Sequence, residues 1–179
     1  MANRNFEIHL LKHSFFQKYP HYDFEEILEK EYRPYFVFKD LINDCTFAVP
    51  FRTNISHNNL YEVKSSKRKS DGKVGLDFSK AVVVNSEDIG RFAGIENWEY
   101  REIEHSFAYI FLKFNRYVNA YKAYAMSEDD NSRTERKFRY SSLRYFNDEL
   151  GLNQNVNKQV AAADELLDLT AEQSKCVSR

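Results

Sequence analysis

The most regular pattern in the sequence is an apolar repeat between Asn97 and Ala125. Its large apolar side chains recur every three or four residues, which is the period of one face of an α-helix. They are Ile103, Phe107, Ile110, Phe111, Phe114, Val118 and Tyr121. A helix with one apolar face is stable when that face packs against another layer of secondary structure. The rest of the chain therefore has to supply a second layer.

Earlier segments have the composition of β-strands. The runs Pro34–Lys39 and Cys45–Phe51 are rich in aromatic and β-branched residues, and a turn signal separates them, so they predict a β-hairpin. Phe6–Leu11 predicts an opening strand, and Leu76–Val84 predicts a strand that returns to the same sheet. Arg52–Tyr61 is mostly polar without a clean period and predicts a loop.

Further helices are predicted at His13–Tyr19, at Phe24–Lys30, from Ser86 onward and over Arg133–Leu150. Strands and helices do not alternate as they would in a parallel α/β protein. The predicted fold class is α+β, with a small, mostly antiparallel sheet and later helices packed on it. We expect a single domain over residues 1–152, followed by a polar linker and a weakly helical tail at 153–179.

Composition excludes several classes of protein. The chain has only 5 Gly and 3 Pro and a formal net charge of −1, which argues against a disordered chain and gives no overall attraction to nucleic acid. Cys45 and Cys176 are far apart and predict two reduced thiols. No apolar run is long enough to span a bilayer, and no signal peptide is visible. We expect a cytoplasmic protein without a membrane partner.

The segment Phe47–His57 carries the strongest chemical signal. It begins as an apolar strand and ends in a cluster of Arg52, Thr53, Ser56 and His57. An arginine fork, two hydroxyls and an imidazole can together hold a phosphate and move a proton beside it. The same residue types also occur together in ordinary solvated loops, so the cluster alone leaves both interpretations open.

Cleavage of RNA without a metal ion needs only these groups, because the ribose 2′-hydroxyl is the nucleophile. His57 can accept or give a proton, Arg52 can clamp phosphate oxygens, and Thr53 and Ser56 can donate hydrogen bonds to the same oxygens. The acidic residues are scattered and do not resemble a two-metal nuclease site. No motif for a nucleotide cofactor or a bound metal is present, so we expect no cofactor.

Basic residues near this segment predict contacts with RNA. Lys64–Lys73 reads as a flexible basic loop, although such runs are often only solvated. The predicted RNA-binding residues are Lys64, Lys67, Arg68, Lys69, Lys80 and Arg116. The Tyr117, Tyr121 and Tyr124 series has helical spacing and predicts core packing more than base stacking.

Several segments, taken in order, resemble a known family. They are the Phe6–Tyr19 segment, the strand entry at Arg33–Tyr35, the strand exit at Val49–Thr53, the return over Gly75–Val84 and the aromatic helix after Trp98. The chain resembles the endoribonuclease toxins of type III toxin–antitoxin systems, the ToxN/AbiQ family, and most of all its CptN/TenpN branch. The similarity covers Phe6 to Leu152.

The resemblance implies a strongly curved antiparallel sheet with a barrel-like core, similar to MazF/Kid-type toxins, and flanking helices. It implies a metal-independent endoribonuclease that leaves a 2′,3′-cyclic phosphate. Its partners would be a small antitoxin RNA, cut from a repeated precursor and closing a toxin–RNA hetero-oligomer, and cellular or phage RNA as substrate. The system would act in phage defence by abortive infection.

The chain departs from the ToxN-like pattern at the active site. In ToxN-like members a Thr/Ser pair and a Lys follow the strand, whereas here Asn54 interrupts the pair and His57 stands near the lysine position. The resemblance implies that Thr53 is the first hydroxyl and that the histidine is a feature of the branch. Two other functions fit the same residues: a non-catalytic RNA-binding module and a protein–protein interaction domain.

Overall fold

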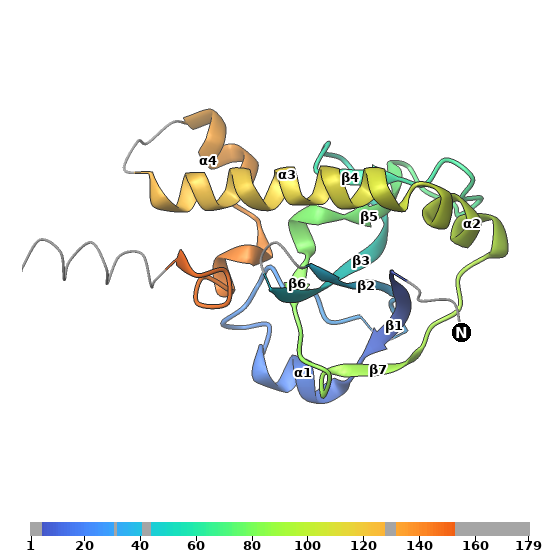
Figure 1. Ribbon diagram of the computed structural model, residues 1–179, viewed down its shortest axis with the longest axis horizontal. Coiled ribbons are helices and arrows are strands. Elements are labelled where there is room, and N and C mark those ends of the chain that lie inside the picture. The colour runs from blue at the N-terminus through green and yellow to red at the C-terminus, as the bar shows by residue number, and fades with distance from the viewer. Residues whose placement is uncertain (1–4, 31, 41–43, 128–131, 153–179) are drawn as a thin grey trace, which may run out of the picture.

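The computed structural model describes residues 5–30, 32–40, 44–127 and 132–152 (Figure 1). The predicted linker and tail at 153–179, with the thiol of the second cysteine, lie outside the described residues, as does most of the predicted hairpin turn. Within them the fold is α+β with an antiparallel sheet, as the sequence predicts. The described Cys45 thiol is buried and unbridged.

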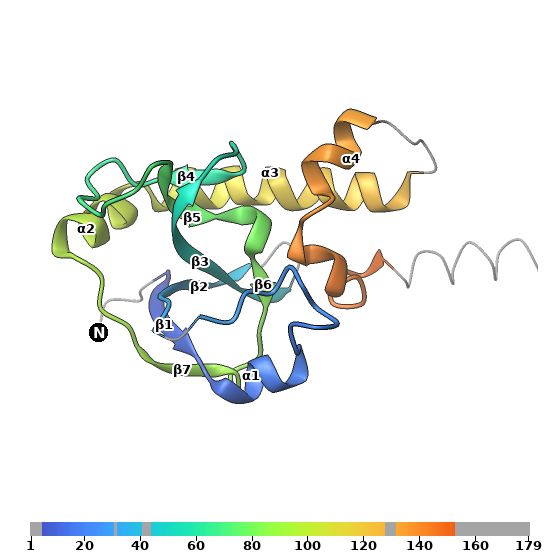
Figure 2. The same cartoon turned by 180° about the vertical axis from the view of Figure 1, so that it is seen from behind.

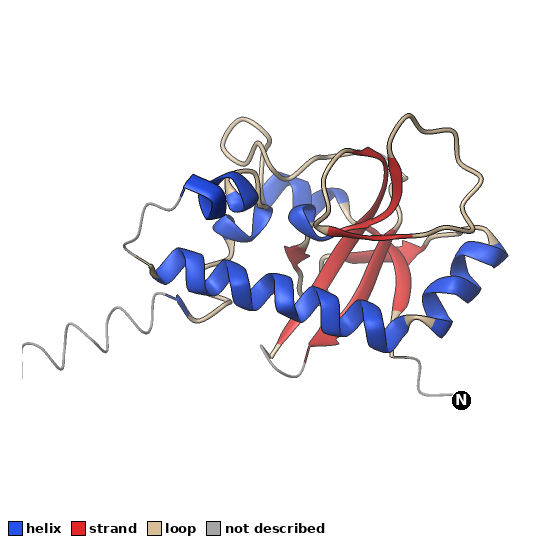
Figure 3. Ribbon diagram, turned by 90° about the horizontal axis from the view of Figure 1, so that it is seen from above, coloured by secondary structure: helices blue, strands red, loops and turns tan. Residues whose placement is uncertain are grey.

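The strands form one antiparallel sheet in the order β4-β5-β3-β2-β1-β7, with β6 paired to β3. Their bounds are β1 Glu7–Leu11, β2 Tyr35–Asp40, β3 Cys45–Ile55, β4 Leu60–Glu62, β5 Lys73–Asp77, β6 Val82–Val83 and β7 Ile89–Phe92. Within the described strands β4 and β7 end the order and do not pair with each other, so the sheet is open. The curved antiparallel sheet is visible in Figure 3, but closure into a barrel is not confirmed.

The helices of the described part are α1 His13–Lys18, α2 Asn97–His105, α3 Phe107–Met126 and α4 Ser132–Phe138, with 3₁₀ turns η1 Phe78–Lys80 and η2 Ser142–Tyr145. The helix predicted over Asn97–Ala125 is therefore two helices that meet at Ser106. Figures 1 and 2 show the longer one, α3, running along the sheet on the side away from α1.

Two helix predictions were wrong and a third was right only at its start, because other hydrogen bonds replace helical pairing. Phe24–Lys30 forms turns. The segment after Ser86 enters β7, since the Asp88 carboxylate accepts from the Asn85 amide and pairs with Lys18. The helix predicted over Arg133–Leu150 ends at Phe138, and the chain then turns through η2, where Ser142 Oγ donates to the Ala81 carbonyl at 2.6 Å.

The central strand β3 changes partner along its length. Residues Cys45–Pro50 pair with β2, and the continuation Phe51–Ile55 pairs with β5, with a register shift after Arg52. The loop predicted over Arg52–Tyr61 was therefore wrong at both ends, because β3 continues to Ile55 and β4 begins at Leu60, and both strands pair with β5. Arg52 and Thr53 consequently lie on a strand in the middle of the sheet.

Both faces of the sheet are buried, which explains the nearly continuous apolar runs. On β2, Phe36 and Phe38 belong to the core on the α3 face, whereas Tyr35 and Val37 face the second core, which contains Phe15 of α1. This alternation follows the two-residue period of a strand. The predicted hairpin and opening strand are confirmed by the pairing of β1, β2 and β3. The return strand predicted over Leu76–Val84 is confirmed only in part, because the 3₁₀ turn η1 divides it into the end of β5 and the short β6, both paired with β3.

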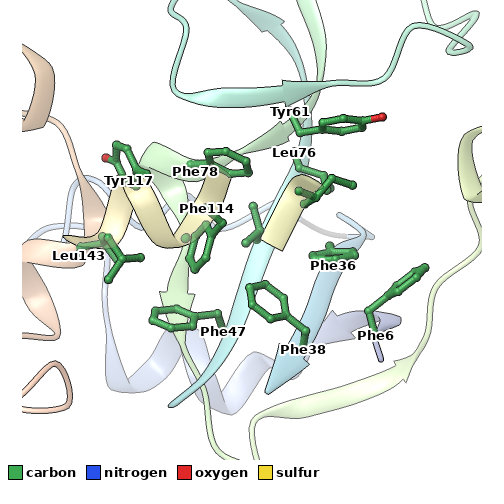
Figure 4. Close-up of a cluster of buried hydrophobic side chains, with 14 of the residues drawn as sticks. Phe6, Phe36, Phe38, Phe47, Tyr61, Leu76, Phe78, Phe114, Tyr117 and Leu143 are labelled. Carbon is green, nitrogen blue, oxygen red and sulfur yellow. The ribbon is translucent and has the colours of Figure 1, made fainter. Parts of the chain in front are cut away.

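Phe114 of α3 is the centre of the larger core (Figure 4). Its ring makes edge-to-face contacts with Phe38, Phe47 and Phe78, at centroid distances of 5.3, 4.9 and 5.4 Å. Tyr117 is buried on the same helix, as predicted for core packing. Because Phe78 opens η1, this packing fixes the position of the residues on either side of it, Asp77 and Ser79.

Candidate functional site

Asp77, at the end of β5, is the centre of a polar cluster beside the core. Its side chain is 0% exposed, and a buried carboxylate is stable only with hydrogen-bonding or charged partners. Arg52 Nη1 donates to Asp77 Oδ2, and Ser79 Oγ donates to Oδ1 at 2.7 Å. His57 Nε2 lies 3.4 Å from the same Oδ1. Residues from β3, η1 and the bend after β3 therefore meet at one carboxylate.

The hydrogen bonds around His57 determine which ring nitrogen carries the proton. Because Ser79 donates its hydroxyl proton to Asp77, its oxygen is left to accept from His57 Nε2, which lies 3.2 Å away. The backbone N–H of Asn59 donates to His57 Nδ1 at 3.2 Å. The neutral imidazole therefore carries its proton on Nε2, and the lone pair of Nδ1 is held by one long hydrogen bond.

The carboxyl group of Asp77 is held in its ionised form. Burial alone would raise its pKa, but hydrogen bonds from His57 and Ser79, with the charges of His57 and Arg52, outweigh burial and hold the pKa below its ordinary value. A fixed negative charge thus lies behind the imidazole. It would stabilise the imidazolium form if His57 accepted a second proton at Nδ1.

Two local features of the sequence place Asp77. Asp77 caps η1, and its Oδ1 accepts from the Ser79 backbone N–H at 3.0 Å. Gly75 lies two residues earlier on β5, where an added Cβ would lie 1.9 Å from the carbonyl oxygen of Tyr61 on β4. Only glycine lets β4 and β5 approach this closely, so this position sets the path of β5 toward the site.

Of the four predicted catalytic residues, the structure brings Arg52 and His57 together through Asp77. Thr53 follows Arg52 on β3 and lines a pocket with it. Ser56 is exposed and makes no hydrogen bond to any residue that the structure describes. Its predicted role as a hydrogen-bond donor stays a prediction.

Asp77 and Ser79 were missed by the sequence reasoning. A signal for both was present, because Asp77 is a lone acid in the otherwise apolar run Val74–Phe78. An acid buried in such a run needs a polar partner, and a serine two residues later is typical of a capped turn.

The predicted flexible basic loop is anchored to α2. Arg68 donates through Nε and Nη2 to Glu99, each at 2.9 Å, and the Glu102 carboxylate accepts from the backbone amides of Lys64 and Ser65. Lys67 Nζ lies 4.9 Å from the centre of the Trp98 ring. The composition of the loop did not reveal these partners, because they come from a helix about thirty residues later.

The other predicted RNA-binding residues differ in their exposure and in their contacts with the rest of the protein. Lys80 is 13% exposed, pairs with Glu26 and donates to the Tyr140 carbonyl at 2.9 Å. Lys64 and Lys69 are exposed. Arg116 is exposed on α3 and lines a pocket of about 160 Å³ with Lys113 and Lys137. Asn59, whose amide holds His57, lines the same pocket, so this basic surface adjoins the imidazole.

A second basic pocket adjoins the cluster through Arg52. Its volume is about 380 Å³, and four cations are among its lining residues: Lys30, Arg33, Arg52 and Arg68. The side chain of His57 is 37% exposed, so a ligand can reach the ring. Each of the two basic pockets therefore shares one residue with the polar cluster: Arg52 lines the larger pocket, and Asn59 lines the smaller one.

Comparison with known proteins adds no relative: no family model, no curated protein and no solved structure matches the chain. No helix in the described ranges is long and apolar enough to cross a membrane. The described residues also contain no group of three or more His, Cys, Asp or Glu side chains placed to hold a metal ion.

Proposed function

We propose that the chain is a metal-independent endoribonuclease whose catalytic centre is His57, supported by Asp77, Ser79 and Arg52. The proposal rests on one arrangement of hydrogen bonds: His57 donates to Ser79, and Ser79 donates to Asp77. The carboxylate of Asp77 is buried and ionised, and it lies 3.4 Å from His57 Nε2. Two basic pockets, one lined by Arg52 and the other by the Asn59 that bonds His57, support a polyanionic substrate.

The proposed reaction is attack of the ribose 2′-oxygen on the adjacent phosphorus. His57 Nδ1 takes the 2′-hydroxyl proton in place of the hydrogen bond from Asn59, while Asp77 stabilises the resulting imidazolium. The bond from the 2′-oxygen to phosphorus forms, the bond to the 5′-oxygen breaks, and the imidazolium returns the proton to the 5′-oxygen. The products are a 2′,3′-cyclic phosphate and a 5′-hydroxyl.

Arg52 and Thr53 are proposed to bind the phosphate. Arg52 commits Nη1 to Asp77, which orients the guanidinium and leaves other N–H groups to donate to phosphate oxygens. Thr53 is partly buried beside it, within the register shift of β3 between Arg52 and Ile55, and its hydroxyl would donate to the same phosphate. Negative charge that develops on the phosphorane would be stabilised by these donors.

The test compares His57→Ala with His21→Ala, a control on an exposed histidine outside the cluster. Loss of general acid–base catalysis typically costs at least about 100-fold in rate. We expect His57→Ala to lose cleavage of single-stranded RNA by that factor and to keep its thermal transition, while the control cleaves normally. Cleavage should continue in EDTA and leave cyclic phosphate ends. Equal cleavage by the two variants would contradict the assignment.

The biological setting of this activity rests on the resemblance of the segments between Phe6 and Leu152 to ToxN/AbiQ toxins. We propose that the chain is the toxin of a type III toxin–antitoxin system, of the CptN/TenpN branch, in the cytoplasm. It would process and be inhibited by a repeated antitoxin RNA in a closed toxin–RNA assembly, with the barrel-like core of MazF/Kid-type toxins. A tandem-repeat array upstream of the coding region would support this setting, and its absence would count against it.

One observation favours a non-catalytic RNA-binding module as the second candidate. Both ring nitrogens of His57 have protein partners, Ser79 and the Asn59 amide, as in a structural histidine. In that case RNA remains intact after prolonged incubation, and His57→Ala lowers the stability of the protein without changing any product.

A further inference from the structure

The larger basic pocket, which Arg52 lines, collects positive charge from three parts of the chain. We call it the arginine pocket and define it by Lys30, Arg33, Arg52 and Arg68. Its other lining residues are Tyr32, Pro34, Phe51, Thr53 and Asn54. Among the described residues no carboxylate lines it, so the described lining consists of cationic, neutral polar and apolar side chains.

Two of the four cations are oriented by buried acids outside the pocket. Arg52 is held by Asp77, and Arg68 by Glu99, whose side chain is also 0% exposed. These pairs use Nη1 of Arg52 and Nε with Nη2 of Arg68, so each guanidinium keeps further N–H groups. The carbon at the centre of the Arg68 guanidinium also lies 4.6 Å from the centre of the Phe51 ring, which fixes its plane.

Arg33 differs from these two because no ion pair joins it to an acid within the described residues. No carboxylate of the described residues lies within ion-pairing distance of it, and its hydrogen-bonding partner is the hydroxyl of Tyr35. Burial lowers the pKa of Arg33, and the charge of Arg52 lowers it further. The two guanidinium groups repel each other in the empty pocket, and a bound anion would relieve that repulsion.

We propose that the arginine pocket binds a phosphate group. Donors that approach from several sides suit a tetrahedral anion, and guanidinium groups match its oxygens in pairs. If the proposed function holds, on which this second statement rests, the group is the RNA backbone phosphate next to the one that is cleaved. Arg52 then contacts both phosphates, because it lines the pocket and shares the Asp77 carboxylate with His57. The pocket would position the RNA strand and would not act on the reacting atoms.

The first test measures binding of a single-stranded 2′-O-methyl RNA oligonucleotide, which lacks the nucleophile and stays intact. Arg33→Gln is compared with wild type and with Arg101→Gln, a matched control on an exposed arginine of α2. Loss of one phosphate contact should weaken binding about 10-fold and reduce the slope of log Kd against log salt by about one. Lys30→Gln, at an exposed position, should show a smaller loss and carries no risk of misfolding.

The second test locates the phosphate. Single uncharged methylphosphonate linkages are placed in turn along the oligonucleotide. At one linkage the substitution should weaken binding by wild type and cause no further loss in Arg33→Gln, since the same contact is removed twice. If the losses of binding from Arg33→Gln and from the methylphosphonate add up at every linkage, Arg33 does not contact a backbone phosphate.

The outcomes separate this inference from the proposed function. Equal binding by Arg33→Gln and Arg101→Gln, with normal cleavage by wild type, would overturn the pocket and leave the endoribonuclease in place. Weakened binding by Arg33→Gln, with wild type unable to cleave any RNA, would support the pocket and overturn the endoribonuclease. Absence of RNA binding by wild type would overturn both.

Discussion

Asp77 connects the core of the molecule to its chemistry at the scale of single residues. Its carboxylate has three side-chain partners, and its backbone lies between the buried residues Leu76 and Phe78. Removing its charge therefore affects both stability and the orientation of His57. In the ion pair with Arg52 the carboxylate is buried and the guanidinium is partly exposed. Truncation of Asp77 would leave the guanidinium without this partner.

An Asp77→Asn variant should be less stable by about 2 kcal/mol at pH 7, since a hydrogen-bonded charge is removed from a buried site. The pKa of Asp77 lies below its ordinary value in the folded protein. Its contribution to stability is therefore complete above the ordinary carboxyl pKa and is lost as the pH falls through the lower, folded pKa. Urea unfolding at pH 7, 4.5 and 3 should show the two proteins converging at acid pH. A constant difference would contradict this.

At the scale of structural elements, the close packing of β4 and β5 depends on Gly75. β4 and β5 approach so closely there that a side chain would overlap the Tyr61 carbonyl. The sequence predicted that the Gly75–Val84 segment returns to the sheet, and the pairing of β5 and β6 with β3 confirms this return, although η1 divides it into two strands. The strand ends were less predictable, because pairing partners far away in the chain decide where β3 stops.

Gly75→Ala should separate β4 from β5 and lower stability by about 1–3 kcal/mol, the range expected for forced overpacking. Gly94→Ala is the matched control, since an added Cβ there meets no atom within 4 Å. Thermal unfolding of both variants tests this. If the two transitions are equally shifted, the close approach of β4 and β5 is not the reason for glycine at this position.

The molecule as a whole is a sheet with a core on each face, and α3 closes the larger core. Phe114 is fully buried among rings from β2, β3 and η1. The aromatic composition and the helical repeat predicted this packing in outline. The identity of the partner rings depended on how the sheet folds under the helix.

Phe114→Ala should cost about 3–5 kcal/mol, as expected for deletion of a buried aromatic side chain. Leu112 lies on the same helix and is 51% exposed, so Leu112→Ala should change stability by no more than about 0.5 kcal/mol. Chemical denaturation gives both values. Because η1 rests on Phe114 through Phe78, the first variant should also weaken RNA cleavage, and unimpaired cleavage would show that the site holds its geometry without this support.

Local pattern in the sequence determined the class of the fold, the hairpin over Pro34–Phe51 and the buried face of α3, because these follow from periods of two and of three to four residues. It also singled out Arg52 and His57 by residue type. Only the tertiary structure decided that they meet at Asp77, that Arg68 is held by Glu99, and that Arg33 lines the same pocket as Arg52 and Arg68. Those contacts join segments tens of residues apart, and their energies depend on burial and on neighbouring charge, which no local pattern records.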